Sequence, residues 1–383
     1  MKFFHTADWH LGKLVQGVYM TEDQAYILNE FIRMVEEEKP DVVLISGDLY
    51  DRAVPPTEAV QLLDDTLQRI VLDLQTPVIA ITGNHDSPSR LDFGSHLMKK
   101  NGFHMIGRMP EHHEPIVLED EFGEVHFHAI PYVEPSTVRH LYEDEDIRNH
   151  NDAHRKIVEK LEENIVSGKR HVLLAHAFVT PYGEEAENTS ESERPLSIGG
   201  SEYVDARIYE TFDYVALGHL HRAHNVHKEN IRYAGSPLKY SISEEHHEKG
   251  FYIVTMDGEG NTEIEKRVLQ PLRDLRTVEG YMEDILKLPP SDDYVFVHLL
   301  DETPVLSPME KVRSVFPNAM HVERKNFSIQ HSSGNSGQAQ ARRKMSDLEL
   351  FRTFYEEVKG EVPSDDAEAI FKEALENVMS ENK

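Results

Sequence analysis

The chain has 383 residues, and 40 Lys and Arg against 69 Asp and Glu give a formal net charge of −29 at pH 7. This length predicts two or three domains, and no apolar run is long enough to span a bilayer. The first residues lack the apolar segment of a signal peptide and cysteine is absent, so we expect a cytoplasmic protein without disulfides or thiolate metal sites. The negative charge argues against a basic surface that coats DNA. The 23 histidines, by contrast, suit a metal site with nitrogen and oxygen ligands.

Short β-branched runs alternate with amphipathic helical patterns, which is typical of an α/β fold. Five runs predict strands, at residues 2–5, 42–46, 78–82, 171–175 and 214–217. Thr21-Glu-Asp-Gln24 resembles a capping box that opens a helix to about Glu38. A second helix is predicted over residues 57–72, with a buried face formed by Val60, Leu63, Leu67 and Ile70.

The pattern changes twice farther along the chain. Strands are predicted at 125–130, 251–256 and 262–268, so the first domain, 1–270, is expected to contain two sheets. The acidic stretch 184–193 is predicted to be a mobile loop. A small α+β domain (271–328), a low-complexity linker (329–345) and a helical tail (346–383) follow. The tail either docks on its own domain or binds a partner, and its pattern leaves both interpretations open.

Polar clusters follow each of the five predicted strands. They are Asp8-Trp-His10, Gly47-Asp48, Gly83-Asn84-His85-Asp86, His176, and Gly218-His219-Leu-His221. Because loops at the carboxyl ends of strands in an open α/β sheet share one crevice, we expect these side chains to lie together. Carboxylate, amide and imidazole groups without sulfur suit two divalent ions of manganese, iron or zinc, which promote phosphoester hydrolysis. Asp48 has two oxygens with which to bridge the ions.

This ordered set of motifs resembles the calcineurin-like metallophosphoesterases, and most closely their bacterial SbcD nuclease branch. The stretches Thr6-Ala-Asp-Trp-His-Leu-Gly12, Ser46-Gly-Asp-Leu-Tyr-Asp51 and Tyr233-Ala-Gly-Ser-Pro237 carry the closer resemblance. It implies a two-sheet sandwich flanked by helices, a small α+β capping domain that selects DNA structure, and a helical tail. The motifs cover roughly residues 1–250, and the later segments resemble the family only in size and order.

The resemblance also implies roles for individual residues. One ion would be held by Asp8, His10, Asp48 and His221, and the other by Asp48, Asn84, His176 and His219. His85 would not bind metal but would stabilise the transition state and protonate the leaving oxygen. The implied metal is Mn²⁺, and the implied activities are 3′–5′ exonuclease and endonuclease on double-stranded DNA ends and hairpins. The implied assembly is a homodimer with an SbcC-type ATPase.

One position departs from the nuclease pattern, because Asp51 stands where archaeal relatives have a histidine. Gly47-Asp-Leu-Tyr-Asp51-Arg52 instead resembles protein phosphatases, in which the second Asp orients the catalytic histidine. We therefore expect Asp51, or alternatively Asp86, to orient His85, and Arg52 either to contact phosphate or to pair with a local carboxylate. Two rival functions remain open. In the first, the chain is a phosphoesterase that acts on phosphoprotein or small phosphodiesters. In the second, it is a binding protein whose metal site is vestigial.

Overall fold

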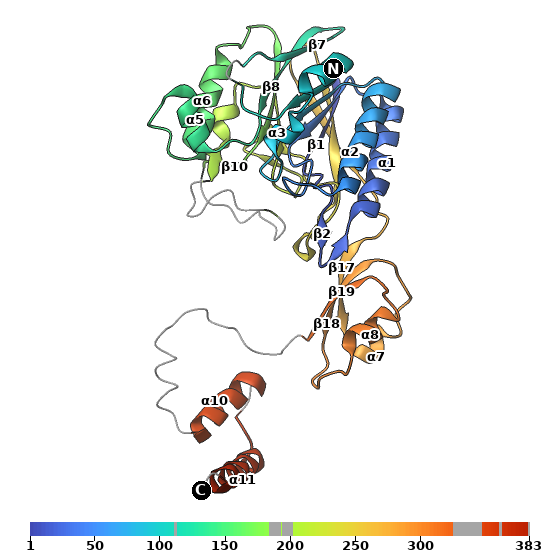
Figure 1. Cartoon of the computed structure of the whole chain (residues 1–383), viewed down its shortest axis with the longest axis vertical. Coiled ribbons are helices and arrows are strands. Elements are labelled where there is room, and N and C mark those ends of the chain that lie inside the picture. The colour runs from blue at the N-terminus through green and yellow to red at the C-terminus, as the bar shows by residue number, and fades with distance from the viewer. Residues whose placement is uncertain (111–112, 184–192, 194–201, 325–346, 360–361, 382–383) are drawn as a thin grey trace. The chain divides into compact units, whose positions relative to one another are not determined.

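The structure is a computed structural model that describes residues 1–110, 113–183, 193, 202–324, 347–359 and 362–381. It divides into two units, Met1–Arg276 and Thr277–Lys383. Figure 1 shows the first unit as a layered body of strands with helices on both sides. Within the part of the chain that the structure describes, no helix combines the length and apolar character that crossing a membrane requires.

Two six-stranded sheets form the centre of the first unit. The first sheet has the order β16 (Thr262–Val268), β15 (Gly250–Met256), β1 (Lys2–Thr6), β4 (Val42–Ser46), β5 (Val78–Ile81) and β6 (Phe103–Ile106). The second has the order β13 (His224–Val226), β14 (Lys228–Tyr233), β12 (Tyr214–Gly218), β9 (Arg170–His176), β8 (Gly123–Ile130) and β7 (Ile116–Asp120). The central strands are parallel in both sheets. They are β1, β4 and β5 in the first sheet and β8, β9 and β12 in the second. The predicted two-sheet α/β fold is confirmed.

Central strands such as β4, β5, β9 and β12 are buried on both faces, which explains why they appear in the sequence as continuous apolar runs rather than as alternating ones. On β9, Val172 and Leu174 pack into the core between the sheets, whereas Leu173 and Ala175 face the second core, which contains Ile157. That residue belongs to α6 (His150–Glu162), which lies with α5 (Pro135–Tyr142) on one side of the sandwich. The helices α1 (Thr21–Glu38) and α2 (Thr57–Leu67) lie on the other side (Figure 1).

The capping-box interpretation of the first helix is wrong. Thr21 is already helical, the N-cap is Met20, and no side chain caps the helix. The side chain of Gln24 instead turns to the buried loop that follows β1, where it donates to the carbonyl of His10 at 2.8 Å. Buried backbone groups need partners more than an exposed helix end does, because water can satisfy the latter.

The second helix also differs from its prediction. The α-helical part ends at Leu67, and a π-helical segment follows directly over Gln68–Asp73. Val60, predicted to be buried, is 45% exposed. The buried stripe instead follows Ala59, Leu63 and Ile70, which are spaced by four and seven residues and therefore share one helical face.

Short elements complete the first unit. They are β2 (Leu14–Val15), β3 (Val18–Tyr19), α3 (Pro88–Leu91), α4 (Ser95–Met98), β10 (Phe178–Thr180), β11 (Tyr203–Asp205) and the 3₁₀ turns Lys99–Asn101, Ala206–Tyr209 and Ile242–Glu244. The predicted acidic loop 184–193 lies outside the described residues except for Glu193.

The second unit contains a three-stranded sheet of β17 (Leu275–Gly280), β18 (Tyr294–Leu299) and β19 (Ala319–Arg324). The first two residues of β17 precede the unit boundary. The helices α7 (Met282–Ile285) and α8 (Pro308–Arg313) pack with β18 and β19 around a small apolar core. The predicted linker 329–345 lies outside the described residues.

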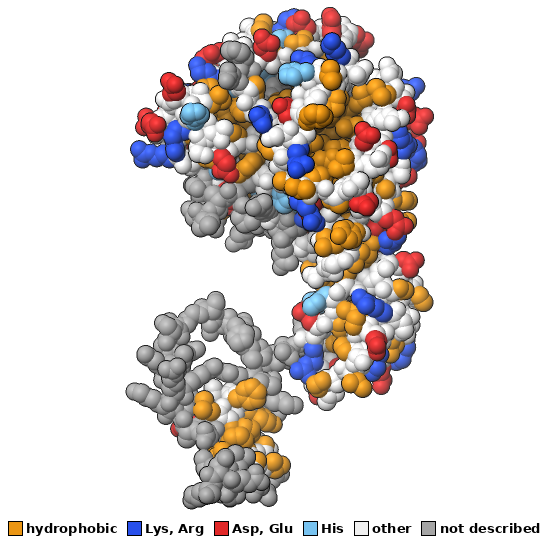
Figure 2. Space-filling model, in the orientation of Figure 1, with side chains coloured by type: hydrophobic (Ala, Val, Ile, Leu, Met, Phe, Trp, Pro, Cys, Tyr) orange, Lys and Arg blue, Asp and Glu red, His pale blue; other side chains and the backbone are white. Residues whose placement is uncertain are grey.

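The tail forms two helices, α10 (Asp347–Lys359) and α11 (Asp365–Glu381). The rings of Phe351 and Phe371 stack with centroids 4.1 Å apart and join the two helices. Apolar side chains nevertheless remain on the surface of the tail (Figure 2), and Phe354 and Ile370 are 63% and 68% exposed.

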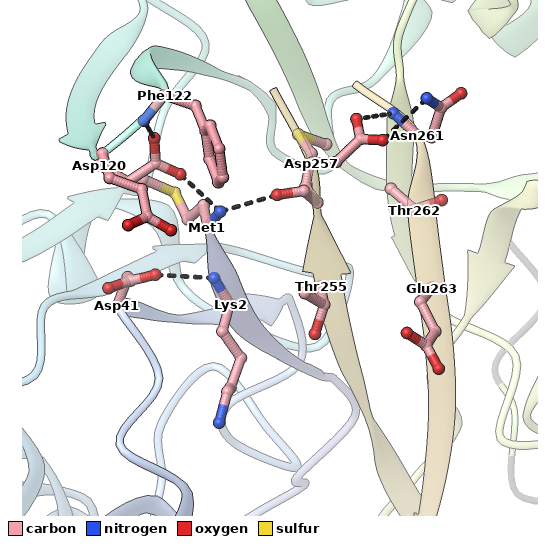
Figure 3. A pocket seen from close by; sticks show the side chains of 12 residues that line it. Met1, Lys2, Asp41, Asp120, Phe122, Thr255, Asp257, Asn261, Thr262 and Glu263 are labelled. Carbon is pink, nitrogen blue, oxygen red and sulfur yellow. Dashed lines mark hydrogen bonds and ion pairs between the residues drawn. The ribbon is translucent and has the colours of Figure 1, made fainter. Parts of the chain in front are cut away.

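A cavity of about 800 Å³ lies at the amino end of β1 and is lined by Met1, Lys2 and the β15–β16 hairpin (Figure 3). Five of its twelve lining residues are acidic, and one of them, Asp120, is held by two hydrogen bonds of 2.9 and 2.6 Å from Arg170. Asp8 and His10 follow the other end of β1, and a strand rises about 3.3 Å per residue. The cavity is therefore separate from the predicted metal site, and none of the predicted ligands lines it.

Candidate metal centre

The predicted ligands follow the carboxyl ends of five strands, three in one sheet and two in the other. Asp8 and His10 follow β1, Asp48 follows β4, Asn84 follows β5, His176 ends β9, and His219 and His221 follow β12. The two sheets face each other across one core, so the loops at this edge come together. The structure brings all seven predicted ligands into one cluster, although the sheets contribute from opposite sides.

The loops hold several of these residues in an unusual backbone conformation. The φ angles of Asp8, His10, Asp48 and His219 are 55°, 44°, 51° and 113°. Non-glycine residues rarely adopt positive φ, and such strain persists only where the surroundings enforce it. Here the buried contacts of the loops enforce it, and the side chains are turned toward one another.

Two glycines permit the close approach of these loops. A Cβ on Gly83 would lie 2.2 Å from Oδ1 of Asp48, and a Cβ on Gly47, whose φ is +95°, would lie 2.3 Å from Nδ1 of His176. Real Cβ atoms do not come so close to other heavy atoms. Glycine at both positions is therefore a condition for bringing the Asp48 and His176 side chains together.

The side-chain atoms form two groups that share one oxygen. In the first group, Nε2 of His10 lies 3.0 Å from Nε2 of His221 and 3.7 Å from Oδ2 of Asp48. In the second group, Oδ1 of Asn84 lies 3.0 Å from Nε2 of His176 and 3.3 Å from Nδ1 of His219. The same Oδ2 of Asp48 lies 3.5 Å from Nε2 of His176. Asp48 thus occupies the position between the groups that a bridging ligand requires.

Asp8 is held by the backbone rather than by a side chain of the first group. Its two carboxylate oxygens accept from the amide of His219 at 2.9 and 3.2 Å. Its Oδ1 lies 4.0 Å from Nδ1 of His176. Its assignment to one ion or the other therefore stays a prediction.

Burial sets the charge state of the cluster. It lowers the pKa values of His10, His176 and His219 below that of a free imidazole, so these rings are neutral and have a lone pair to offer. Burial, followed by the nearby charge of Asp48, raises the pKa of Asp8 well above its ordinary value. Two buried carboxylates this close are best satisfied by a cation.

The donor set fits divalent metal ions. Asp8, Asp48 and His176 offer ligand atoms that all lie within 4.8 Å of one another. Nδ1 of His10 is buried without a hydrogen-bond partner among the described residues, and it lies 3.6 Å from Oδ1 of Asp51. Mixed imidazole, amide and carboxylate ligation without sulfur matches manganese, iron or zinc.

Two further residues support the loop that carries His10, and sequence reasoning missed both. The amide of Gln24 donates to the carbonyl of His10, and its oxygen accepts from the amide of Gly12 at 3.0 Å. The hydroxyl of Tyr240 donates to the carbonyl of Trp9 at 2.5 Å and accepts from Gln24 at 3.1 Å. Tyr240 follows the Tyr233–Pro237 motif closely, which was the available signal, whereas Gln24 resembled a helix cap.

His85 lies beside the cluster and is partly exposed. Its backbone amide donates to Oδ1 of Asp48 at 2.8 Å, and its Nδ1 lies 2.8 Å from the backbone carbonyl of Asp51. Its ring centroid is 4.7 Å from that of His10. This places a histidine next to the predicted ligands with Nδ1 already engaged.

Asp51 lies against His85, and its role in orienting that ring stays a prediction. Asp51 contacts Nδ1 of His85 through its main chain, whereas its carboxylate pairs with Lys13 at 2.8 Å. The alternative, Asp86, uses its carboxylate to accept from the amides of Gly83, Leu49 and Tyr50. Burial raises the pKa of Asp86 to about 8. The turn after β4 brings the carbonyl of Asp51 to Nδ1 of His85, and the Asp51 carboxylate has an oxygen within 4.8 Å of a ring nitrogen of His85.

Arg52 is exposed, and no hydrogen bond or ion pair joins its guanidinium to any residue that the structure describes. The alternative in which it pairs with a local carboxylate is therefore not observed. Its side chain is available to an external anion.

Comparisons with known proteins identify the family of the chain. The sequence matches the calcineurin-like phosphoesterase family over residues 1–223 and the type 5 capsule protein repressor C-terminal domain over residues 271–359. It is 35% identical over 361 residues to the SbcD component of the nuclease SbcCD of Staphylococcus epidermidis, covering 93% of this chain and 92% of that one.

The solved structures that the comparison found share little sequence with this chain. A dimetal phosphatase from Danio rerio is 11% identical with a TM-score of 0.38, covering 71% of this chain and 98% of that one. A Thermus thermophilus protein is 8% identical with a TM-score of 0.36, covering 69% and 98%. The family match over more than half of the chain and the nearly full-length relative carry the assignment: the chain belongs to the calcineurin-like phosphoesterases and, within them, to the SbcD nucleases, which are metal-dependent phosphodiesterases.

Proposed function

We propose that the chain is the nuclease component of an SbcCD-type complex and hydrolyses DNA phosphodiester bonds with two divalent ions, most readily Mn²⁺. The observation that carries the proposal is the shared Oδ2 of Asp48, 3.7 Å from His10 and 3.5 Å from His176. One carboxylate between two sets of imidazoles is the arrangement that a two-metal phosphoesterase needs. The activities are 3′–5′ exonuclease and endonuclease, used in DNA end processing, hairpin cleavage and repair.

In this proposal Asp8, His10, Asp48 and His221 hold one ion, and Asp48, Asn84, His176 and His219 hold the other. Two bound divalent ions supply a Lewis acid for a phosphoryl oxygen and activate water near neutral pH. The protein holds the ligands ready for this chemistry, because burial keeps the imidazoles neutral and the strained loops fix their directions.

His85 supplies the proton that the leaving oxygen takes up. Because Nδ1 faces the carbonyl of Asp51, that nitrogen carries a hydrogen, and Nε2 is left to hold a proton and deliver it to the leaving oxygen. The bond from its amide to Asp48 fixes the distance between the acid and the bridging carboxylate. Arg52, exposed and without a partner among the described residues, binds the phosphate backbone of the substrate.

The remaining segments select the substrate and the partner. The proposed domains are 1–270 for the chemistry, 271–328 for recognition of DNA structure, 329–345 as a linker, and 346–383 for binding an SbcC-type ATPase. Exposed apolar side chains on the tail, among them Phe354 and Ile370, support the last role. A homodimer that acts in the cytoplasm completes the proposal.

A purified full-length chain tests the proposal with end-labelled linear duplex and hairpin DNA. We expect Mn²⁺-dependent degradation of the duplex and cleavage of the hairpin, and loss of both in His85→Ala with its metal content unchanged. Parallel assays with a phosphopeptide and a small phosphodiester test the rival phosphoesterase. Hydrolysis of those substrates without action on DNA would overturn the proposal, and failure to bind Mn²⁺ would favour a vestigial site. A pull-down of the ATPase with and without residues 341–383 tests the tail.

A further inference from the structure

His221 is fixed from three directions by groups that no motif of the family predicted. Its Nδ1 lies 3.0 Å from Oε1 of Glu244, and its carbonyl accepts from Nζ of Lys249 at 2.9 Å. Its backbone amide donates to Glu193 at 2.6 Å. Nδ1 therefore donates to the carboxylate, and Nε2, which lies 3.0 Å from Nε2 of His10, is left with its lone pair.

Glu244 is itself buried and held in place. Its carboxylate is 0% exposed, and Oε2 lies 2.5 Å from Nζ of Lys249 and 3.3 Å from the amide of Tyr240. Lys249, also buried, donates further to the hydroxyl of Ser236 at 2.9 Å. A buried carboxylate with this many partners cannot rotate away from the imidazole without leaving a charge unpaired.

Among the described residues, no carboxylate lies within hydrogen-bond distance of Nδ1 of His176, although Oδ1 of Asp8 lies 4.0 Å from it. Nδ1 of His176 donates to a backbone carbonyl, that of Ser46, at 2.9 Å. His219 faces Asn84 with Nδ1, and no carboxylate contacts its ring among the described residues. In the first group, by contrast, the carboxylate of Glu244 is within hydrogen-bond distance of Nδ1 of His221, at 3.0 Å. The two groups therefore differ in what stands behind their ligands.

We infer that Glu244, held by Lys249, is a positioning residue for His221 and makes the two metal positions unequal, so that the ion at His10, Asp48 and His221 binds more tightly than the ion at Asn84, His176 and His219. A carboxylate behind a metal-binding imidazole fixes the tautomer and raises the basicity of the ligating nitrogen, more than a carbonyl does. Loss of such a partner typically weakens metal binding about 10- to 100-fold.

The inference rests on the proposed two-metal site, and its test separates the two. Mn²⁺ is titrated into the metal-free full-length protein by calorimetry, with free Mn²⁺ counted by electron paramagnetic resonance. We expect two steps of different affinity in the wild type. Absence of any Mn²⁺ binding would contradict the proposed function, whereas two steps of equal affinity would contradict only the inference.

Variants then assign the steps. Glu244→Gln keeps the size of the side chain and removes its charge, and it should weaken the tighter step about 10- to 100-fold and leave the weaker step unchanged. Asn84→Ala should weaken the other step alone. Glu245→Gln, a neighbouring carboxylate that is 24% exposed, is the matched control and should change neither.

A second variant guards against misfolding. Glu244→Gln leaves the Lys249 ammonium buried without its ion pair, so the double variant Glu244→Gln/Lys249→Met removes both charges together. It should melt near the wild-type temperature without metal and show the same weakening of the tighter step. Wild-type binding in either variant, or equal weakening of both steps, would overturn the inference.

Discussion

Replacing Gly83 by alanine should disable the site through one steric contact. The new Cβ would lie 2.2 Å from Oδ1 and 2.5 Å from the backbone nitrogen of Asp48. A change of side-chain rotamer could relieve the first contact but not the second, so the turn after β4 has to move by about 1 Å to reach an ordinary separation. Asp48 also accepts the amide hydrogen of His85, so the displacement reaches the proposed acid as well.

The expected magnitudes follow from that displacement. A misplacement of about 1 Å at a reacting centre lowers kcat about 100-fold, and overpacking of a buried turn lowers the free energy of unfolding by about 1–3 kcal/mol. Because Asp48 is the shared ligand, both Mn²⁺-binding steps should weaken together.

The assays are Mn²⁺ calorimetry, hydrolysis of labelled duplex, and thermal melting of the metal-free protein. Gly280→Ala is the matched control, because its backbone is also outside the left-handed region and its nearest contact would be an ordinary 3.5 Å to Ile285. It should change none of the three measurements. Wild-type Mn²⁺ affinity and kcat in Gly83→Ala would refute the reasoning.

Three further predictions concern groups around the site and at the far end of β1. Asp51→Asn should change kcat less than about 5-fold, because a backbone carbonyl engages His85; a 100-fold loss in steady-state hydrolysis would show that the carboxylate itself acts. Gln24→Ala leaves buried backbone groups unpaired and should lower the free energy of unfolding by about 2 kcal/mol in denaturant titrations, with weaker Mn²⁺ binding; unchanged stability and binding would contradict the proposed support. Asp120→Asn should lower the free energy of unfolding by about 2 kcal/mol at pH 7. The reason is that hydrogen bonds from Arg170 stabilise the ionised carboxylate and hold the pKa of Asp120 below its ordinary 3.8. That contribution is present above pH 4 and fades as pH falls further, so melting curves of the variant and the wild type should converge in acid, and a constant gap would contradict this origin.

The sequence by itself determined the strands and the order of the ligands. Residues 42–46 and 262–268 were predicted with the bounds that the structure shows. For residues 42–46 the reason is burial on both faces, which leaves a continuous apolar signature. The clusters after each strand carried the family resemblance for the same local reason, since strand, turn and polar residue are adjacent in the chain. The acidic net charge was a poor guide to binding partners, because a net charge does not say where on the surface the charged residues lie.

Tertiary structure alone decided which atoms meet. The amide of His219 binds Asp8 across 211 positions of the chain, and Tyr240 reaches Trp9 across 231. Such contacts depend on how two sheets pack, and no local period encodes that packing. The same reason explains why Gln24 resembled a cap in the sequence, why a carbonyl rather than the Asp51 carboxylate engages His85, and why Glu244 escaped notice. Residue types and spacing predicted the ligands, while packing selected the groups behind them.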